Sequence, residues 1–151
     1  MADAQKLNTR FDGPAQSPGL LLWRTTMRWQ RVMTATLAPL DLTHVQFVLL
    51  ASAMSLGRNG EAPNQGEVAA QAGTDVKMTS DVMARLEAKG LVVRETDPHD
   101  SRAKTIRITP AGRTAAQRAI VAVEAADAVF FEPVNQAQLV TVLGELAGEV
   151  R

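Results

Sequence analysis

The chain has 151 residues, with 16 basic against 16 acidic side chains, 46% hydrophobic residues and no cysteine. Its length and apolar content suit one domain with a buried core and exclude intrinsic disorder for most of the chain. The lack of cysteine excludes disulfides, thiolate metal ligands and a cysteine nucleophile, and a net charge of zero counts against indiscriminate binding to nucleic acid.

No apolar run is long enough to span a membrane, and the start of the chain lacks the pattern of a secretory signal. We therefore expect a cytoplasmic protein without membrane contact. Residues 1–16 are polar, contain Gly13-Pro14 and show no periodicity. They predict a flexible arm ahead of a single domain over residues 17–151.

The first predicted helix begins at Ser17-Pro18, a capping residue followed by a proline suited to the first helical position. Apolar residues then recur at helical spacing as far as Leu37, and Pro39 ends the run.

The second predicted helix carries a capping box made by Thr43 and Gln46, with Leu42 and Phe47 placed to form a hydrophobic staple. It should end near Leu56, before a loop over residues 57–60. Its core-facing residues are expected to be Phe47, Leu50 and Met54.

Two helices and a β-hairpin follow. Asn64 and Glu67 open a short helix that ends at Gly73, and Asp75 caps a helix over residues 76–89, which together fit a helix-turn-helix. Residues 91–96 and 105–108 are β-prone and flank a polar, turn-rich stretch, so they predict a hairpin with an extended tip.

Two more helices complete the chain. Thr109-Pro110 caps a long helix that could reach Phe131, and a last helix is expected from about Asn135 to Val150. Its apolar residues are spaced four, three and four apart, like a coiled-coil seam on a helix too short to stand alone: Leu139, Leu143, Leu146 and Val150.

This order of elements is that of a winged helix flanked by extra helices, so we expect a mainly α fold with a small β-hairpin wing. The stretches Met83 to Val92, Asp97 to Arg102 and Ile108 to Arg113 resemble the MarR family of bacterial transcriptional regulators. The combination of Arg-Leu-Glu-x-x-Gly-Leu-Val, Asp-x-Arg and Ile-Thr-x-x-Gly in this order is specific, and the resemblance covers residues 18–150.

The resemblance implies a homodimer that binds a pseudo-palindromic operator in double-stranded DNA, most often as a repressor of nearby genes. Residues 17–40 and 110–151 would form the dimerisation helices, and residues 41–109 the DNA-binding region. The dimer interface would then include the seam residues of the last helix: Leu139, Leu143, Leu146 and Val150. Many members release DNA when a small aromatic acid or phenol binds. The alternatives are a winged helix that binds protein and not DNA, and a metal-responsive regulator, which two distant histidines without cysteine disfavour.

The predicted recognition helix can be divided into two faces at 100° per residue. Its core arc consists of Val76, Thr79, Val82, Met83 and Leu86. The opposite face carries Lys77, Ser80, Asp81, Ala84 and Ala88. The candidate DNA-binding residues of the helix are Lys77, Met78, Ser80, Asp81, Ala84 and Arg85. Without the hairpin and the resemblance, this face would be interpreted as an ordinary solvated surface.

Asp81 departs from the Gln or Arg that similar sequences commonly carry at this place. A carboxylate is repelled by phosphate but can accept a hydrogen bond from cytosine, so Asp81 is expected to add discrimination rather than affinity. An ion pair with Lys77 or Arg85 is the equally weighted alternative.

At the hairpin tip, the resemblance implies that Asp100 orients Arg102, which inserts into the minor groove. Lys104 and Arg107 would supply phosphate contacts. An ion pair that merely stiffens the loop is the alternative interpretation of Asp100 and Arg102.

Trp23 and Arg24 are the candidate effector-binding residues, because an arginine beside an aromatic ring can bind an aromatic carboxylate. Core or interface packing is the more common use of such residues. No catalytic set or phosphate loop has positional support, so we expect no enzyme, no metal and no cofactor.

The zero charge divides unevenly along the chain. Residues 102–113 hold four bases and no acid, whereas residues 114–151 hold two bases and five acids, a net of minus three. The sequence therefore predicts a local positive wing, weak non-specific DNA binding and reliance on two-fold avidity.

Overall fold

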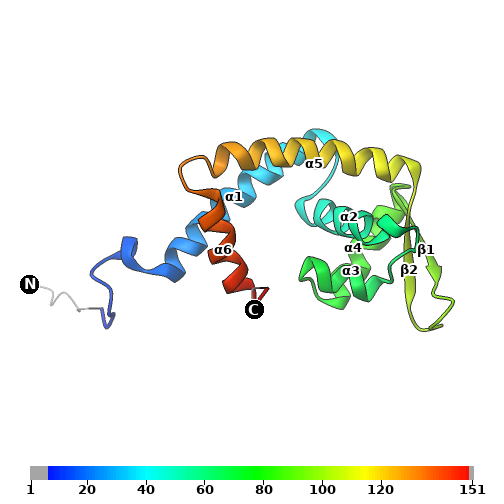
Figure 1. The fold of residues 1–151 in the computed structure, drawn as a ribbon, viewed down its shortest axis with the longest axis horizontal. Helices are drawn as coiled ribbons and strands as arrows, with labels where there is room; N and C mark the ends of the chain where they lie inside the picture. The colour runs from blue at the N-terminus through cyan, green and yellow to red at the C-terminus, as the bar shows by residue number, and fades with distance from the viewer. Residues whose placement is uncertain (1–6, 150–151) are drawn as a thin grey trace, which may run out of the picture.

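The structure, a computed structural model, describes residues 7–149. Three short 3-10 turns lie at Pro14–Gln16, Ala38–Leu40 and Gly57–Asn59. The helices are α1 (Pro18–Leu37), α2 (His44–Leu56), α3 (Gln65–Ala72), α4 (Val76–Ala88), α5 (Pro110–Phe130) and α6 (Gln136–Ala147), and the strands are β1 (Val92–Thr96) and β2 (Lys104–Ile108). The predicted fold class, mainly helical with a β-hairpin wing, is confirmed (Figure 1).

The helix starts are fixed by the capping side chains that the sequence indicates. Ser17 accepts a hydrogen bond from the Leu20 N–H at 3.3 Å, and the Thr43–Gln46 box at the start of α2 is complete. The Asn64–Glu67 box of α3 is complete as well. Each cap satisfies backbone donors that the first helical turn leaves without partners.

The last helix is shorter than the sequence predicts. Gly148 adopts a left-handed conformation with φ of 76° and ends α6 after Ala147. A glycine at this position terminates a helix readily because it has no Cβ to clash. Val150, the predicted end of the helix, lies outside the described residues.

The helices fall into two groups (Figure 1). α1 and α5 pack side by side along the length of the molecule, and α6 turns away from the end of α5. α2, α3, α4 and the hairpin gather beneath the other end of α5. One core joins the groups, with Leu37 of α1, Leu50 of α2, Met83 of α4, Ile106 of β2 and Ala116 of α5 all at most 1% exposed. Phe47 and Met54 are only partly buried against it.

The hairpin is attached to the helical core at two places, through β2 and at the start of β1. β1 pairs antiparallel with β2 from Val92–Ile108 to Thr96–Lys104. The Ile106 N–H also donates to the Pro63 carbonyl at 2.8 Å, so the loop before α3 borders β2. At the start of α5, a Cβ on Gly112 would lie 1.9 Å from the Leu91 carbonyl oxygen. Only glycine therefore allows α5 to approach the beginning of the hairpin so closely.

Candidate nucleic-acid interface

The turn between α3 and α4 is built by small polar side chains. Gly73 has φ of 68° and ends α3. Thr79, fully buried, donates to the Asp75 carbonyl at 2.8 Å and lies 2.7 Å from the Thr74 hydroxyl. The Asp75 carboxylate accepts from the Met78 N–H at 2.8 Å. These bonds set the angle at which α4 leaves the turn, and so they position its outer face.

One face of α4 is buried as the periodicity predicts, with one exception. Thr79, Val82, Met83 and Leu86 are at most 7% exposed. Val76, predicted to join them, is 74% exposed, so that prediction is wrong. It is the first residue of the helix and lies at the edge of the buried arc, where the neighbouring helices do not cover it.

The predicted DNA-facing side chains of α4 are accessible: Lys77, Met78, Asp81, Ala84, Ala88 and Arg85 are exposed, and Ser80 is half-buried. Asp81 makes no ion pair with Lys77 or Arg85, since the salt bridges within residues 7–149 involve other groups. The carboxylate is thus available on the outer face of α4. Its role stays a prediction.

The wing tip is shaped by acids that bind backbone groups. The Asp97 carboxylate accepts from the His99 N–H at 2.8 Å, and the Asp100 carboxylate accepts from the Arg102 N–H at 3.0 Å. Asp100 therefore holds the backbone of Arg102, while the Arg102 guanidinium has no ion-pair partner among residues 7–149. The hydrogen bond between the two residues runs through the main chain of Arg102, so the expectation that Asp100 orients the Arg102 side chain stays a prediction.

The two other predicted wing contacts lie on different faces of the hairpin. β2 alternates, so Lys104 shares a face with Ile106 and Ile108, whereas Arg107 is on the opposite face. The Lys104 ammonium donates to the Thr96 hydroxyl at 3.4 Å. The Arg107 guanidinium donates to the Glu95 carboxylate at 3.0 Å. Arg107 is therefore already paired with an acid, which the sequence analysis did not identify.

Two further contacts, which the sequence does not predict, fix the C-terminal end of α4. The Lys89 ammonium donates to the Gln46 side chain at 3.1 Å and to the Asp41 carbonyl. Glu87 accepts from the Arg94 N–H at 2.8 Å, and this bond holds the pKa of the Glu87 carboxyl below its ordinary value. Asp41 has φ of 53°, a strained value for a residue with a side chain. No sequence motif marks these pairs, because their members are 7 to 48 residues apart.

The effector candidates Trp23 and Arg24 are exposed, and Trp23 is 62% accessible. The second tryptophan is the one that packs: the Trp29 indole N–H donates to Asp127 of α5 at 2.7 Å, and its ring meets His44 edge-on at 4.9 Å. Burial lowers the pKa of the His44 imidazole, and the nearby Asp127 carboxylate opposes this shift. The assignment of Trp23 and Arg24 stays a prediction.

The predicted dimer seam is largely uncovered in the single chain. Leu143 and Leu146 are 42% and 72% exposed, Leu139 is half-buried, and α6 has no buried residue. Val150 lies outside the described residues. An apolar helix face this open is unusual for a monomer and is typical of an interface.

Neither a metal cluster nor a single membrane-spanning helix occurs within residues 7–149. No cluster of three or more His, Asp or Glu side chains that could hold a metal ion occurs among them. No single helix is long and apolar enough to cross a membrane; α1 and α2 pass such a test only as a pair bent by 76°.

Comparison with known proteins gives consistent matches. The MarR family model matches residues 42–104. The uncharacterized HTH-type transcriptional regulator YdcH of Bacillus subtilis is 40% identical over 124 residues, which are 82% of this chain and 84% of YdcH.

Two solved structures are similar over most of their length. A MarR family transcriptional regulator from Rhodococcus sp. RHA1 is 29% identical with a TM-score of 0.81, covering 91% of this chain and 96% of the other. CouR from Rhodococcus jostii RHA1, solved bound to p-coumaroyl-CoA, is 28% identical with a TM-score of 0.79 and the same coverage.

Proposed function

Because this chain belongs to the MarR family of transcriptional regulators, and is not an enzyme, we propose that it is a homodimeric repressor of nearby genes that binds a pseudo-palindromic operator. The observation that carries the proposal is the pairing of an exposed α4 face with a wing whose tip presents Arg102 without an acidic partner among residues 7–149. α4 would enter the major groove and Arg102 the neighbouring minor groove.

A dimer is supported by the open apolar face of α6. Leu143 and Leu146 would be buried against the partner subunit, together with parts of α1 and α5. Two α4 helices related by a two-fold axis would then meet half-sites about 10 base pairs apart, or a multiple of that. Low net charge and few phosphate contacts per subunit make both half-sites necessary for firm binding.

A small aromatic acid or phenolic effector would release the DNA. CouR, which is similar to this chain, is solved with p-coumaroyl-CoA, whose acyl group carries a phenol, and this supports a phenolic effector. Trp23 and Arg24 remain the residues proposed to bind it. Whichever ligand acts, the factor by which it weakens operator binding must equal the factor by which DNA weakens ligand binding.

The test is a duplex selected from a random pool, with its affinity measured across a salt series. DNA binding predicts a selected palindrome and a linear fall of log affinity with log salt concentration. A winged helix that serves only as a protein-interaction module would select no duplex. Quenching of Trp fluorescence by benzoates or phenols, compared between the wild type and Arg24→Gln, tests the effector site separately.

A further inference from the structure

A small cleft lies at the root of the wing, and Arg107, a proposed phosphate contact, is among the residues that line it. Its volume is about 160 Å³, and it is bounded by the end of α2, the loop before α3, β2 and the first turn of α5. The residues that matter for its chemistry are Ala53, Met54, Pro63, Ile106, Ile108 and Arg113. A cavity of about 150 Å³ is large enough to hold a benzene ring.

The walls combine apolar side chains with three charged residues, Glu61, Arg107 and Arg113, and the apolar part is held in place. Ala53 and Ile106 are each 1% exposed, and the Ile106 N–H bonds the Pro63 carbonyl at 2.8 Å, which joins two walls of the cleft. Gly57 lies against Pro63, because a Cβ built on it would be 3.8 Å from the proline ring. The cleft is therefore shaped by packed residues and backbone hydrogen bonds before any ligand arrives.

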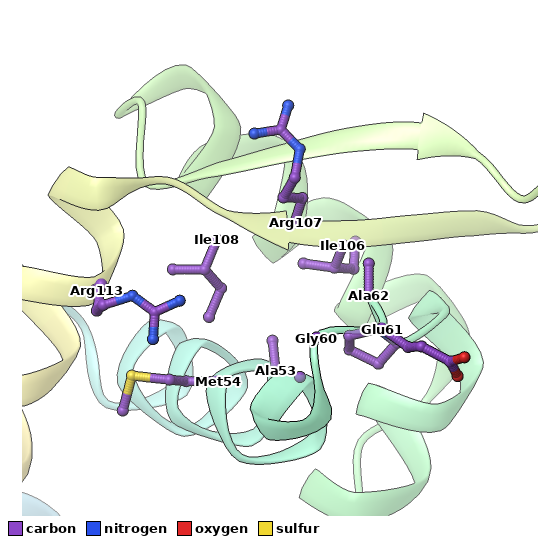
Figure 2. A pocket seen from close by; sticks show the side chains of 11 residues that line it. Ala53, Met54, Gly60, Glu61, Ala62, Ile106, Arg107, Ile108 and Arg113 are labelled. Carbon is purple, nitrogen blue, oxygen red and sulfur yellow. The ribbon is translucent and has the colours of Figure 1, made fainter.

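One exposed arginine, Arg113, is directed at the apolar part of the cleft. Figure 2 shows the Arg113 side chain turned toward Ile108 and Met54, whereas Arg107 and Glu61 point away from them. Arg107 is engaged by Glu95 at 3.0 Å, but Arg113 has no ion-pair partner within residues 7–149. Close packing of Gly112 on Leu91 fixes the helical turn from which Arg113 projects.

We propose that this cleft binds a small organic carboxylate, with an apolar body of about one ring between α2 and β2 and its carboxylate on the Arg113 guanidinium. Arginine pairs with carboxylates through two parallel hydrogen bonds, and a pocket that combines apolar walls with a few charged groups is typical of a small-molecule site. This site is separate from Trp23 and Arg24, since the first part of α1 lies at the other end of the molecule from the wing (Figure 1).

The sequence provides an unusually direct probe. It contains only three isoleucines: Ile106 and Ile108 line the cleft, and Ile120 lies farther along α5. Carbon-13 labelling of isoleucine δ1 methyl groups therefore gives two reporters inside the site and one outside it. Binding is read without DNA, so its failure would leave the proposed repressor function unaffected.

The experiment titrates the intact protein with sodium benzoate, with acetate and the neutral benzamide as comparison ligands. We expect saturable shifts of the Ile106 and Ile108 methyl signals with benzoate, little movement of Ile120, and much weaker binding of benzamide. Arg113→Gln should raise the benzoate dissociation constant about tenfold or more, because the carboxylate loses its bidentate partner.

Arg118→Gln, which removes an exposed arginine from the same helix, is the matched control and should bind benzoate like the wild type. Circular dichroism checks that both variants fold. The proposal is overturned by the absence of saturable shifts at millimolar benzoate, by equal binding of benzamide, by unchanged affinity in Arg113→Gln, or by a dominant shift at Ile120.

Discussion

Glu87 near the end of α4 accepts a hydrogen bond from the backbone N–H of Arg94 in β1 at 2.8 Å and faces its guanidinium at 3.4 Å. One acidic side chain thus joins the proposed recognition helix to the wing. Relative movement of the two DNA-reading elements is restricted by this contact, together with the shared core.

The Glu87 contact should make part of the stability dependent on pH. The pKa of Glu87 is lowered in the folded state, chiefly by the Arg94 N–H, so its contribution is present above the unfolded value of 4.5 and is lost as pH falls through the folded pKa. Glu87→Gln should cost about 0.5 kcal/mol at neutral pH, a small value because the side chain is 39% exposed. Urea unfolding at several pH values measures this difference in unfolding free energy, which should vanish in acid. The exposed Glu61→Gln is the control. A loss of stability in Glu87→Gln that persists unchanged in acid would contradict the prediction.

Removal of the arginine at the wing tip should weaken operator binding without unfolding the protein. Arg102 is exposed and its guanidinium makes no ion pair within residues 7–149, so Arg102→Ala removes no internal contact. We expect a loss of about 1–3 kcal/mol per half-site in a fluorescence-anisotropy titration. Arg118→Ala serves as the control, and operator affinity equal to the wild type would refute the minor-groove assignment.

Asp81 is expected to repel phosphate wherever its carboxylate finds no cytosine. Asp81→Asn removes that repulsion, so binding to unrelated DNA should tighten, while discrimination between operator and unrelated DNA should fall. Competition titrations with both duplexes measure this ratio, and Glu124→Gln on α5 provides a neutralisation away from the interface. Unrelated DNA that binds Asp81→Asn no better than the wild type would exclude the proposed role.

The Glu95–Arg107 pair gives a test of the second wing cation. The two side chains are 54% and 55% exposed, so the pair contributes little to stability, and Glu95→Gln should leave folding unchanged. If Arg107 contacts phosphate, its release should raise operator affinity and steepen the salt dependence by about one counterion per contact. Glu95→Gln in an Arg107→Ala background is the control and should show no gain in operator affinity. An unchanged salt dependence in Glu95→Gln alone would place Arg107 away from the DNA.

The proposed dimer depends on the apolar face of α6. Leu146→Glu should shift the protein to monomer, because a carboxylate would be buried in the interface without a partner. Sedimentation measures the mass, and the monomer should bind the operator poorly because it loses the second half-site. Val76→Glu is a matched control for the sedimentation measurement only, since Val76 is 74% exposed against 72% for Leu146. A dimer that survives Leu146→Glu would exclude this surface as the dimer interface.

The local elements of this protein are readable from its sequence because their signals are themselves local. Thr43 with Gln46, Asn64 with Glu67, and the alternation around Ile106 each act over a few residues. The same kind of signal gave a wrong prediction for the burial of Val76 and for the last residue of α6. Periodicity does not reveal which neighbouring element covers a residue, and the apolar spacing runs past Gly148, where the left-handed backbone ends the helix.

The contacts that position the candidate site could not be predicted in this way. Lys89 meets Gln46 across 43 positions, and Trp29 meets Asp127 across 98, so only the packing of the helices decides that they are partners. The net charge of zero shows the same difference between what the sequence determines and what the tertiary structure decides. The sequence alone determined a neutral chain with a basic stretch over residues 102–113. Tertiary structure decided that Arg107 is paired with Glu95 while Arg102 and Arg113 have no acidic partner among the described residues, because charge pairing depends on distance in space and not on order along the chain.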